Sequence, residues 1–161
     1  MMRVGIGFDV HPFVSGRELV LGGVKIPYTM GLEGHSDADA LTHAICDAIL
    51  GALAEGDIGT HFPDTDPIYK GICSLNLLRD VIRLMQSEAY RVINIDATIV
   101  CEEPKLASYM ASMKENIQHI CGAGSVVNIK ATRNERMGFI GRKEGLACIA
   151  VALLAEFDGI V

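Results

Sequence analysis

Two side chains near the start of the chain, Asp9 and His11, could bind a metal ion together. They lie two residues apart in RVGIGFDVH (3–11), a segment whose apolar residues recur with a period of two. On a strand this spacing directs both side chains to the same side, which Gly5 and Gly7 leave open. The alternative is an exposed strand end with two ordinary polar residues, and the pair alone does not decide between the two.

His43 is a third candidate, in the clearest predicted helix. This helix begins near Ser36, because Ser36 and Asp39 have the spacing of a capping box and a regular apolar stripe follows. One histidine on a helix is more often solvated or hydrogen-bonded than a metal ligand. Asp39 or Asp47, one turn to either side, could accept the proton of its non-ligating nitrogen and fix its tautomer. Asp39 is equally explained as a residue of the helix start.

An aspartate and two histidines form a metal site with an open coordination position. A closed structural zinc site needs a fourth protein ligand, whereas a catalytic site leaves that position to water or substrate. Cys46, one turn after His43, is the alternative fourth ligand, but a cysteine on a helix is more often a small core residue. The trio therefore predicts a catalytic metal, provided that the fold brings Asp9, His11 and His43 together.

Two polar segments favour a substrate with phosphate and hydroxyl groups. Gly34, His35 and Ser36 stand at the predicted helix start, and a helix N-terminus attracts anions. The loop at 56–67 is rich in aspartate, whose carboxylates suit hydroxyl groups better than phosphate. A solvated acidic surface explains this loop equally well.

The composition limits the function classes. A net charge of −6 and a pI near 5.3 argue against nucleic-acid binding, which needs basic patches. No apolar run reaches the roughly 18 residues of a membrane span, and no signal peptide is apparent. Five scattered cysteines without a C-x-x-C pair favour a reducing, cytoplasmic location. Because 50% of the residues are apolar, we expect the surplus to lie in a subunit interface.

The remaining elements predict one α+β domain over residues 1–161. We expect a hairpin at 19–26 around Gly22-Gly23, helices at 74–86 and about 106–117, and strands at 92–101 and 126–132. Ser74 is the expected cap of the helix at 74–86. Residues 133–145 have the composition of a polar loop, and the apolar run 146–157 fits a strand or a buried helix.

Several long motifs in order resemble those of the 2-C-methyl-D-erythritol 2,4-cyclodiphosphate synthases of the non-mevalonate isoprenoid pathway. The motifs are GIGFDVHPF (5–13), GHSDADALTHAICDAILGAL (34–53), GDIGTHFPDTDPIYKG (56–71), EPK (103–105) and KATRNERMGFIGRKEGLA (130–147). The resemblance runs from residue 3 to about 157. It implies a mixed four-stranded sheet with helices on one face, a small N-terminal hairpin, and homotrimers whose sheets pack around an axis, with active sites between subunits. The final apolar run would then be a strand.

The resemblance also implies a ring-closing lyase reaction. In 4-diphosphocytidyl-2-C-methyl-D-erythritol 2-phosphate, the 2-phosphate attacks the β-phosphorus and CMP leaves, which forms the cyclic diphosphate. The attacking phosphate oxygen is already ionised at neutral pH. The enzyme must therefore supply positioning and charge neutralisation rather than a general base.

Matching positions carry the family's site residues onto this chain. Zinc would be held by Asp9, His11 and His43, a second ion, Mg²⁺ or Mn²⁺, by Glu135, and the catalytic residues would be His35, Thr132 and Arg133. The phosphates and the methylerythritol would be bound by Asp9, His11, His35, Ser36, Asp57, Ile58, Gly59, Phe62, Pro63, Asp64, Thr65 and Asp66. The cytidine side would comprise Cys101, Pro104, Lys105, Leu106, Ala107 and Thr132, and the substrate would also be bound by Arg133, Asn134 and Glu135. Phe139 and Arg142 match a central cavity that can hold an isoprenoid diphosphate, although Arg142 could instead pair with Glu144.

One departure from the family pattern affects a catalytic position. Arg133 and Asn134 stand where many relatives continue a run of threonines, the second of which is usually assigned a transition-state role. Thr132 could take that role, or Arg133 could neutralise phosphate charge itself. Two other functions stay open from the residues: a zinc phosphohydrolase that uses metal-bound water, and a non-catalytic sensor of an isoprenoid diphosphate near Arg142.

Overall fold

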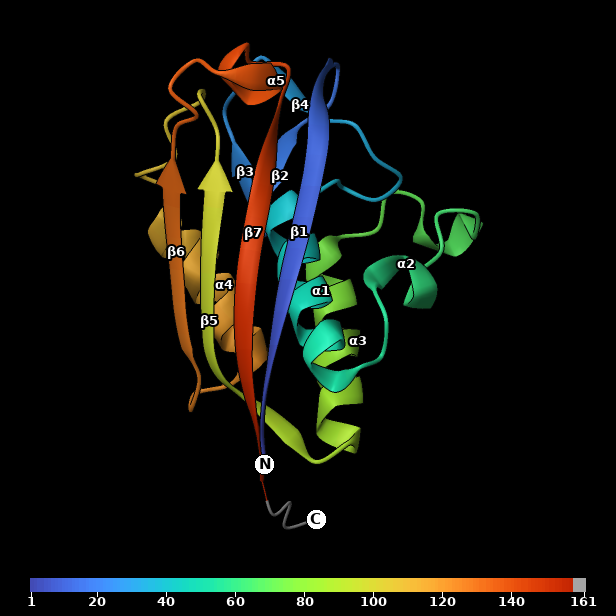
Figure 1. Ribbon diagram of the computed structural model, residues 1–161. Coiled ribbons are helices and arrows are strands. Elements are labelled where there is room, and N and C mark those ends of the chain that lie inside the picture. The colour runs from blue at the N-terminus through green and yellow to red at the C-terminus, as the bar shows by residue number, and fades with distance from the viewer. Residues whose placement is uncertain (158–161) are drawn as a thin grey trace.

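A five-stranded mixed sheet forms the frame of the computed structural model, which describes residues 1–157 (Figure 1). The strands, in the sheet order β4-β1-β7-β5-β6, are Met30–Leu32, Met2–Ser15, Gly145–Glu156, Tyr90–Val100 and Val126–Thr132. Only β5 and β6 are parallel; the other neighbours are antiparallel. The predicted α+β class is confirmed, but the sheet has five strands rather than four. The extra strand, β4, has three residues, too few for a pattern of period two to identify.

Three helices cover one face of this sheet, and the small hairpin lies beside them (Figure 1). They are α1 (Ala40–Leu53), α3 (Ser74–Ser87) and α4 (Met110–Cys121). The hairpin consists of β2 (Leu19–Leu21) and β3 (Val24–Ile26), joined as predicted through Gly22 and Gly23 at positive φ. Shorter helices interrupt segments predicted as loops: α2 (Ile58–His61), the 3₁₀ turn η1 (Pro67–Tyr69) and α5 (Gly138–Gly141). Residues 158–161 of the predicted single domain lie outside the described residues.

Gly5 and Gly7 let α1 lie directly on β1. A Cβ atom at Gly5 would stand 2.0 Å from the carbonyl oxygen of Ala48, and one at Gly7 would stand 1.9 Å from that of Ala44. The sequence suggested that the two glycines leave an open surface, and this prediction is wrong. They remove side chains so that helix backbone can take their place, which sets the distance between His43 on α1 and Asp9 on β1.

The start of α1 is Ala40, not the region of Ser36. Asp39 is the N-cap, and its buried carboxylate accepts from the backbone N–H of Thr42 at 3.0 Å. The same carboxylate accepts from the N–H groups of Gly22 at 2.8 Å and Gly23 at 2.7 Å. Asp39 thus joins the helix start to the β2–β3 turn. Burial raises the pKa of Asp39, although these hydrogen bonds counteract the rise.

The opposite face of the sheet is apolar and exposed along β1 and β7 in the single chain. On β1, Ile6 is 70% exposed and Phe8 is 56% exposed, with Val4 and Val10 alongside. Residues 145–156 form a strand, β7, of which Ile149 and Val151 face outward on the same side. Both faces of β7 are apolar, which explains why its sequence shows no alternation. An exposed apolar face of this kind marks an interaction surface. Within residues 1–157, no helix is long and apolar enough to cross a membrane.

Candidate metal centre

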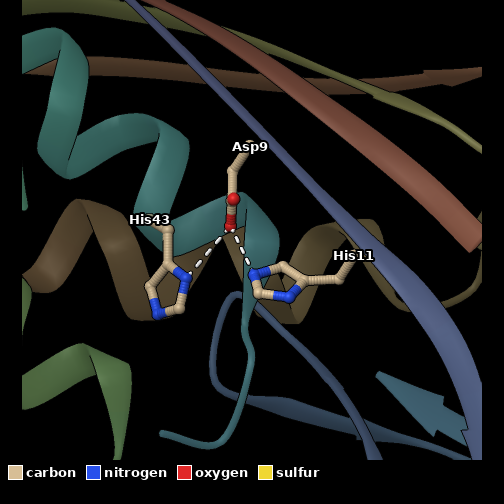
Figure 2. Close-up of side chains that lie close together, drawn as sticks. All are labelled: Asp9, His11 and His43. Atoms are coloured by element: carbon tan, nitrogen blue, oxygen red, sulfur yellow. Dashed lines mark hydrogen bonds and ion pairs between the residues drawn. The ribbon is translucent and has the colours of Figure 1, made fainter. Parts of the chain in front are cut away.

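Asp9, His11 and His43 converge on one point, as the family resemblance implied (Figure 2). Asp9 Oδ2 lies 2.9 Å from His11 Nε2 and 3.0 Å from His43 Nδ1. The three ligand atoms all lie within 4.8 Å of one another. Strand alternation places Asp9 and His11 on the helix-covered side of β1, and the first turn of α1 supplies His43.

The charges of the trio favour an ionised carboxylate. Burial alone would raise the pKa of Asp9, but the hydrogen bonds and charges of His11 and His43 hold it well below its usual range. Burial alone would lower the pKa of His11, but Asp9 raises it above the usual value. Without a metal ion, the carboxylate therefore favours protonation of His11, and a divalent cation would compete with that proton for the carboxylate.

The orientation of His11 suits a metal ligand. Its Nδ1 lies 2.5 Å from the carbonyl oxygen of Glu33, which can only accept, so we assign the Nδ1 proton to this bond. In neutral His11 the lone pair of Nε2 then faces Asp9 Oδ2 at 2.9 Å. Two lone pairs at that distance repel each other unless a positive charge lies between them. A positive metal ion bound by one oxygen and two nitrogen atoms would remove this repulsion and keep an open coordination position.

The prediction that Asp39 or Asp47 accepts a proton from the ring of His43 is wrong. Asp39 caps α1, and the carboxylate of Asp47 accepts from the N–H of Ile58 at 2.8 Å; neither carboxylate is hydrogen-bonded to the ring of His43. Cys46 is fully buried in the hydrophobic core and is not a fourth ligand. The ring of His43 instead directs Nε2 at two hydroxyl groups. Ser74 Oγ lies 2.8 Å away, and Ser36 Oγ lies 3.2 Å away. The sequence predicts Ser74 only as the cap of α3, whose N-cap is in fact Cys73. Nothing in the sequence links Ser74 to His43, which lies 31 residues away.

A cavity of about 580 Å³ opens beside the trio. Its lining includes His11, His35, Ser36, His43, Ile58, Gly59, Phe62, Pro63, Asp64 and Thr65, all predicted site residues. It also includes Tyr69, Ile72 and Leu77, which the sequence did not indicate. The structure thus brings most of the predicted phosphate and methylerythritol residues to one place.

Two aspartates predicted for this cavity have structural roles. Asp57 caps α2, accepting from Thr60, and Asp66 accepts from the N–H of Ile68 at 3.0 Å. Neither lines the cavity. The hydrogen bonds from Thr60 lower the pKa of Asp57. The acidic composition of the loop therefore reflects two helix starts as well as a binding surface.

The segment 34–36 does not stand at a helix N-terminus, because α1 begins four residues later. Arg17 holds it instead, donating to the carbonyl oxygens of Gly34 at 2.5 Å and Ser36 at 2.6 Å. This fixes the backbone on which His35 and Ser36 reach the cavity.

A second hollow, of about 430 Å³, lies beyond the ends of β5 and β6. It is lined by the predicted residues Cys101, Pro104, Lys105, Leu106, Ala107, Thr132, Arg133 and Glu135, together with Glu102, Met110 and Ala131. Asn134 is absent from this lining. Its backbone N–H donates to Glu102 Oε1 at 3.0 Å, and the N–H of Arg136 donates to the same oxygen at 2.9 Å. Glu102 thereby fixes the loop that carries Arg133 and Glu135.

The two hollows lie near different strands of the sheet, one near β1 and the other near β6. β1, with Asp9 and His11, is separated by β7 and β5 from β6, after which Glu135 follows (Figure 1). Three intervals between strands amount to roughly 14 Å. Glu135 therefore does not join the metal trio within one chain, and His35 is likewise apart from Thr132. Arg142 pairs with Glu144, at 2.7 Å, as one of the two sequence interpretations had it.

Comparison with known proteins agrees with this geometry. A model of the YgbB family matches residues 2–155. The 2-C-methyl-D-erythritol 2,4-cyclodiphosphate synthase of Syntrophotalea carbinolica is 60% identical over 155 residues, 96% of this chain and 94% of that protein. The bifunctional IspDF of Campylobacter jejuni has a TM-score of 0.93 at 43% identity, over 98% of this chain and 43% of that one. A CDP complex of IspF from Plasmodium falciparum has a TM-score of 0.85 at 32% identity, over 98% and 97% of the two chains. This chain belongs to the YgbB family.

Proposed function

We propose that the chain is a cyclising lyase, a 2-C-methyl-D-erythritol 2,4-cyclodiphosphate synthase. It converts 4-diphosphocytidyl-2-C-methyl-D-erythritol 2-phosphate to 2-C-methyl-D-erythritol 2,4-cyclodiphosphate and CMP. The observation that carries this proposal is the metal trio at the wall of a cavity lined by the residues expected for the phosphates and the methylerythritol. The curated relatives at 60% and 58% identity carry the same enzyme name.

The complete active site is formed between copies of the chain. One chain holds the metal trio in one hollow and Thr132, Arg133 and Glu135 in another, so two different surfaces must meet. Contact between two different surfaces produces a ring when the rotation closes. We expect a homotrimer packed on the exposed apolar face around Ile6 and Phe8. Such a trimer would bury that face and bring the two hollows of neighbouring copies together.

The residues of the two hollows divide the work of the reaction. Asp9, His11 and His43 would hold zinc, and Glu135 a second ion, Mg²⁺ or Mn²⁺; bound there, such ions supply positive charge to the phosphate oxygens. The ionised 2-phosphate forms the new bond to the β-phosphorus, and the bond to the CMP oxygen breaks. His35 and Ser36 position the phosphates from one side of the cavity.

The second hollow receives the leaving group. Lys105 and Arg133 offer positive charge to the phosphate of CMP, and Thr132 offers a hydroxyl donor. The cytidine-linked substrate agrees with the CDP named in the Plasmodium falciparum complex. The unpaired thiols of all five cysteines agree with a cytoplasmic location. An isoprenoid diphosphate in a central cavity would have to compete with Glu144 for Arg142.

The test is product analysis on the purified protein. Substrate and Mg²⁺ should yield equal amounts of CMP and the cyclic diphosphate, measured by chromatography and ³¹P NMR, with metal analysis of the same sample. His43→Ala should lose zinc and activity while remaining folded. Linear products, or hydrolysis of simple phosphate esters without a cytidine requirement, would identify a phosphohydrolase instead. Tight binding of an isoprenoid diphosphate without any turnover would identify a sensor.

A further inference from the structure

Ser74 connects His43 to a carboxylate that the metal trio does not contain. It is the first residue of α3 and is fully buried. Its hydroxyl donates to Asp37 Oδ1 in a short hydrogen bond, and its backbone N–H donates to Asp37 Oδ2 at 2.9 Å. Asp37 is held in turn through its own N–H, which donates to the carbonyl oxygen of Ile72 at 3.1 Å. Asp37 therefore accepts two hydrogen bonds from Ser74 and fixes the direction of its hydroxyl proton.

The proton count assigns the tautomer of His43. A serine hydroxyl has one proton, and a carboxylate accepts hydrogen bonds without donating any. Because that proton goes to Asp37, Ser74 Oγ offers only lone pairs to His43 Nε2, 2.8 Å away. In neutral His43 the Nε2 atom must then carry the ring proton. Nδ1 is left with its lone pair, 3.0 Å from Asp9 Oδ2.

We infer that Asp37 and Ser74 are positioning residues that hold His43 as the Nε2–H tautomer with Nδ1 aimed at the metal. This inference rests on the proposed function, since it assumes that the trio binds zinc. The carbonyl oxygen of Glu33 does the same for His11 through the opposite ring nitrogen, leaving Nε2 for the metal. Loss of a hydrogen bond that orients a histidine ligand typically weakens metal binding by about 10- to 100-fold.

The same assignment of protons leaves the hydroxyl proton of Ser36 without an acceptor in this group. Ser36 Oγ accepts from the N–H of Ala38 at 3.1 Å and lies 3.2 Å from His43 Nε2, which already carries a proton. Its own proton therefore has no acceptor in this group and turns toward the cavity that Ser36 lines. Ser74 orients the ligand, whereas Ser36 offers a donor to a substrate phosphate.

The test is zinc affinity, measured on the full chain by competition with a chromophoric chelator after metal removal. Ser74→Ala and Asp37→Asn should bind zinc about 10- to 100-fold more weakly than the wild type. Ser74→Thr keeps the hydroxyl and should retain most of the affinity. The matched control is Ser87→Ala at the other end of α3, where the exposed hydroxyl only donates to the carbonyl oxygen of Leu84. This control should leave zinc binding unchanged.

A measurement on the wild type avoids any effect of substitution on folding. Long-range ¹H–¹⁵N correlation spectra of the zinc-loaded protein should show His43 with its proton on Nε2 and His11 with its proton on Nδ1. The opposite tautomer at His43, or wild-type zinc affinity in Ser74→Ala, would overturn the role of Ser74 while leaving the metal site intact. A wild type that takes up no zinc would overturn the metal assignment in the proposed function, and this inference with it.

Discussion

Substituting Gly7 by alanine should damage the metal site without touching any of its ligands. The added Cβ would stand 1.9 Å from the carbonyl oxygen of Ala44 and 2.7 Å from the backbone nitrogen of Ala48. Real Cβ atoms stay at least 3.0 Å from such neighbours, and both of these atoms belong to helix backbone. Helix α1 must therefore move away from β1 by about 1 Å, because no side chain is available to yield.

The size of the effect follows from that displacement. Overpacking of this kind typically costs about 1–3 kcal/mol of unfolding free energy. His43 is adjacent in sequence to Ala44 and moves with it, whereas Asp9 and His11 stay on β1. Metal–ligand distances tolerate only about 0.2 Å, so a shift of about 1 Å should weaken zinc binding at least tenfold.

Urea denaturation and zinc titration together test this reasoning. Gly51→Ala is the matched control on the same helix, because its new Cβ would meet nothing closer than Ile6 O at 3.8 Å. It should keep zinc affinity and gain up to about 1 kcal/mol from the better helix propensity of alanine. If Gly7→Ala kept both the stability and the zinc affinity of the wild type, close packing of α1 on β1 would not position His43.

Three further predictions concern stability and assembly. Asp39→Asn should cost about 2–3 kcal/mol in urea unfolding, because an amide NH₂ would face the N–H of Gly22 or Gly23 in a buried place; an unchanged midpoint would contradict this. In metal-free protein, the raised pKa of His11 contributes stability that is complete below its usual value of 6.5 and is lost as the pH rises through the raised value. Urea unfolding across that range should show the decline, and His11→Gln should flatten it. Ile6→Lys, on the exposed sheet face, should give monomers by light scattering with a normal circular-dichroism spectrum, and persistent trimers would exclude that face as the interface.

Local patterns were sufficient to predict much of the fold and the elements that carry the metal ligands, but not that the three ligands meet. Alternation along β1 placed Asp9 and His11 on one side, and the apolar stripe placed His43 in a helix. Both inferences rest on residues close in sequence, where the period of the backbone decides which side chains share a face. The glycine pair at 22–23 predicted a tight turn for the same reason.

Partners distant in sequence could not be predicted in this way. Ser74 is predicted as a helix cap, yet Cys73 is the N-cap of α3 and the hydroxyl of Ser74 belongs to a network with Asp37 and His43. Gly5 and Gly7 suggested an open surface, because the sequence of β1 does not indicate that the backbone of α1 occupies the space beside them. β4 is too short for any period. In each case the deciding contact joins two segments whose approach only the folded chain defines.

The separation of the two hollows allows a last test, which uses two inactive variants. Under the proposed function, His43→Ala removes the metal trio from one hollow and Glu135→Ala removes the second ion ligand from the other. If each active site takes one hollow from each of two neighbouring copies, trimers assembled from an equal mixture contain some sites built from two intact hollows. Random assembly gives about one quarter of the sites this composition, so refolding the two variants together should restore about a quarter of wild-type CMP release. Each variant refolded alone should stay inactive. No recovery from the mixture would mean that both residues serve the same chain, which the roughly 14 Å between β1 and β6 argues against.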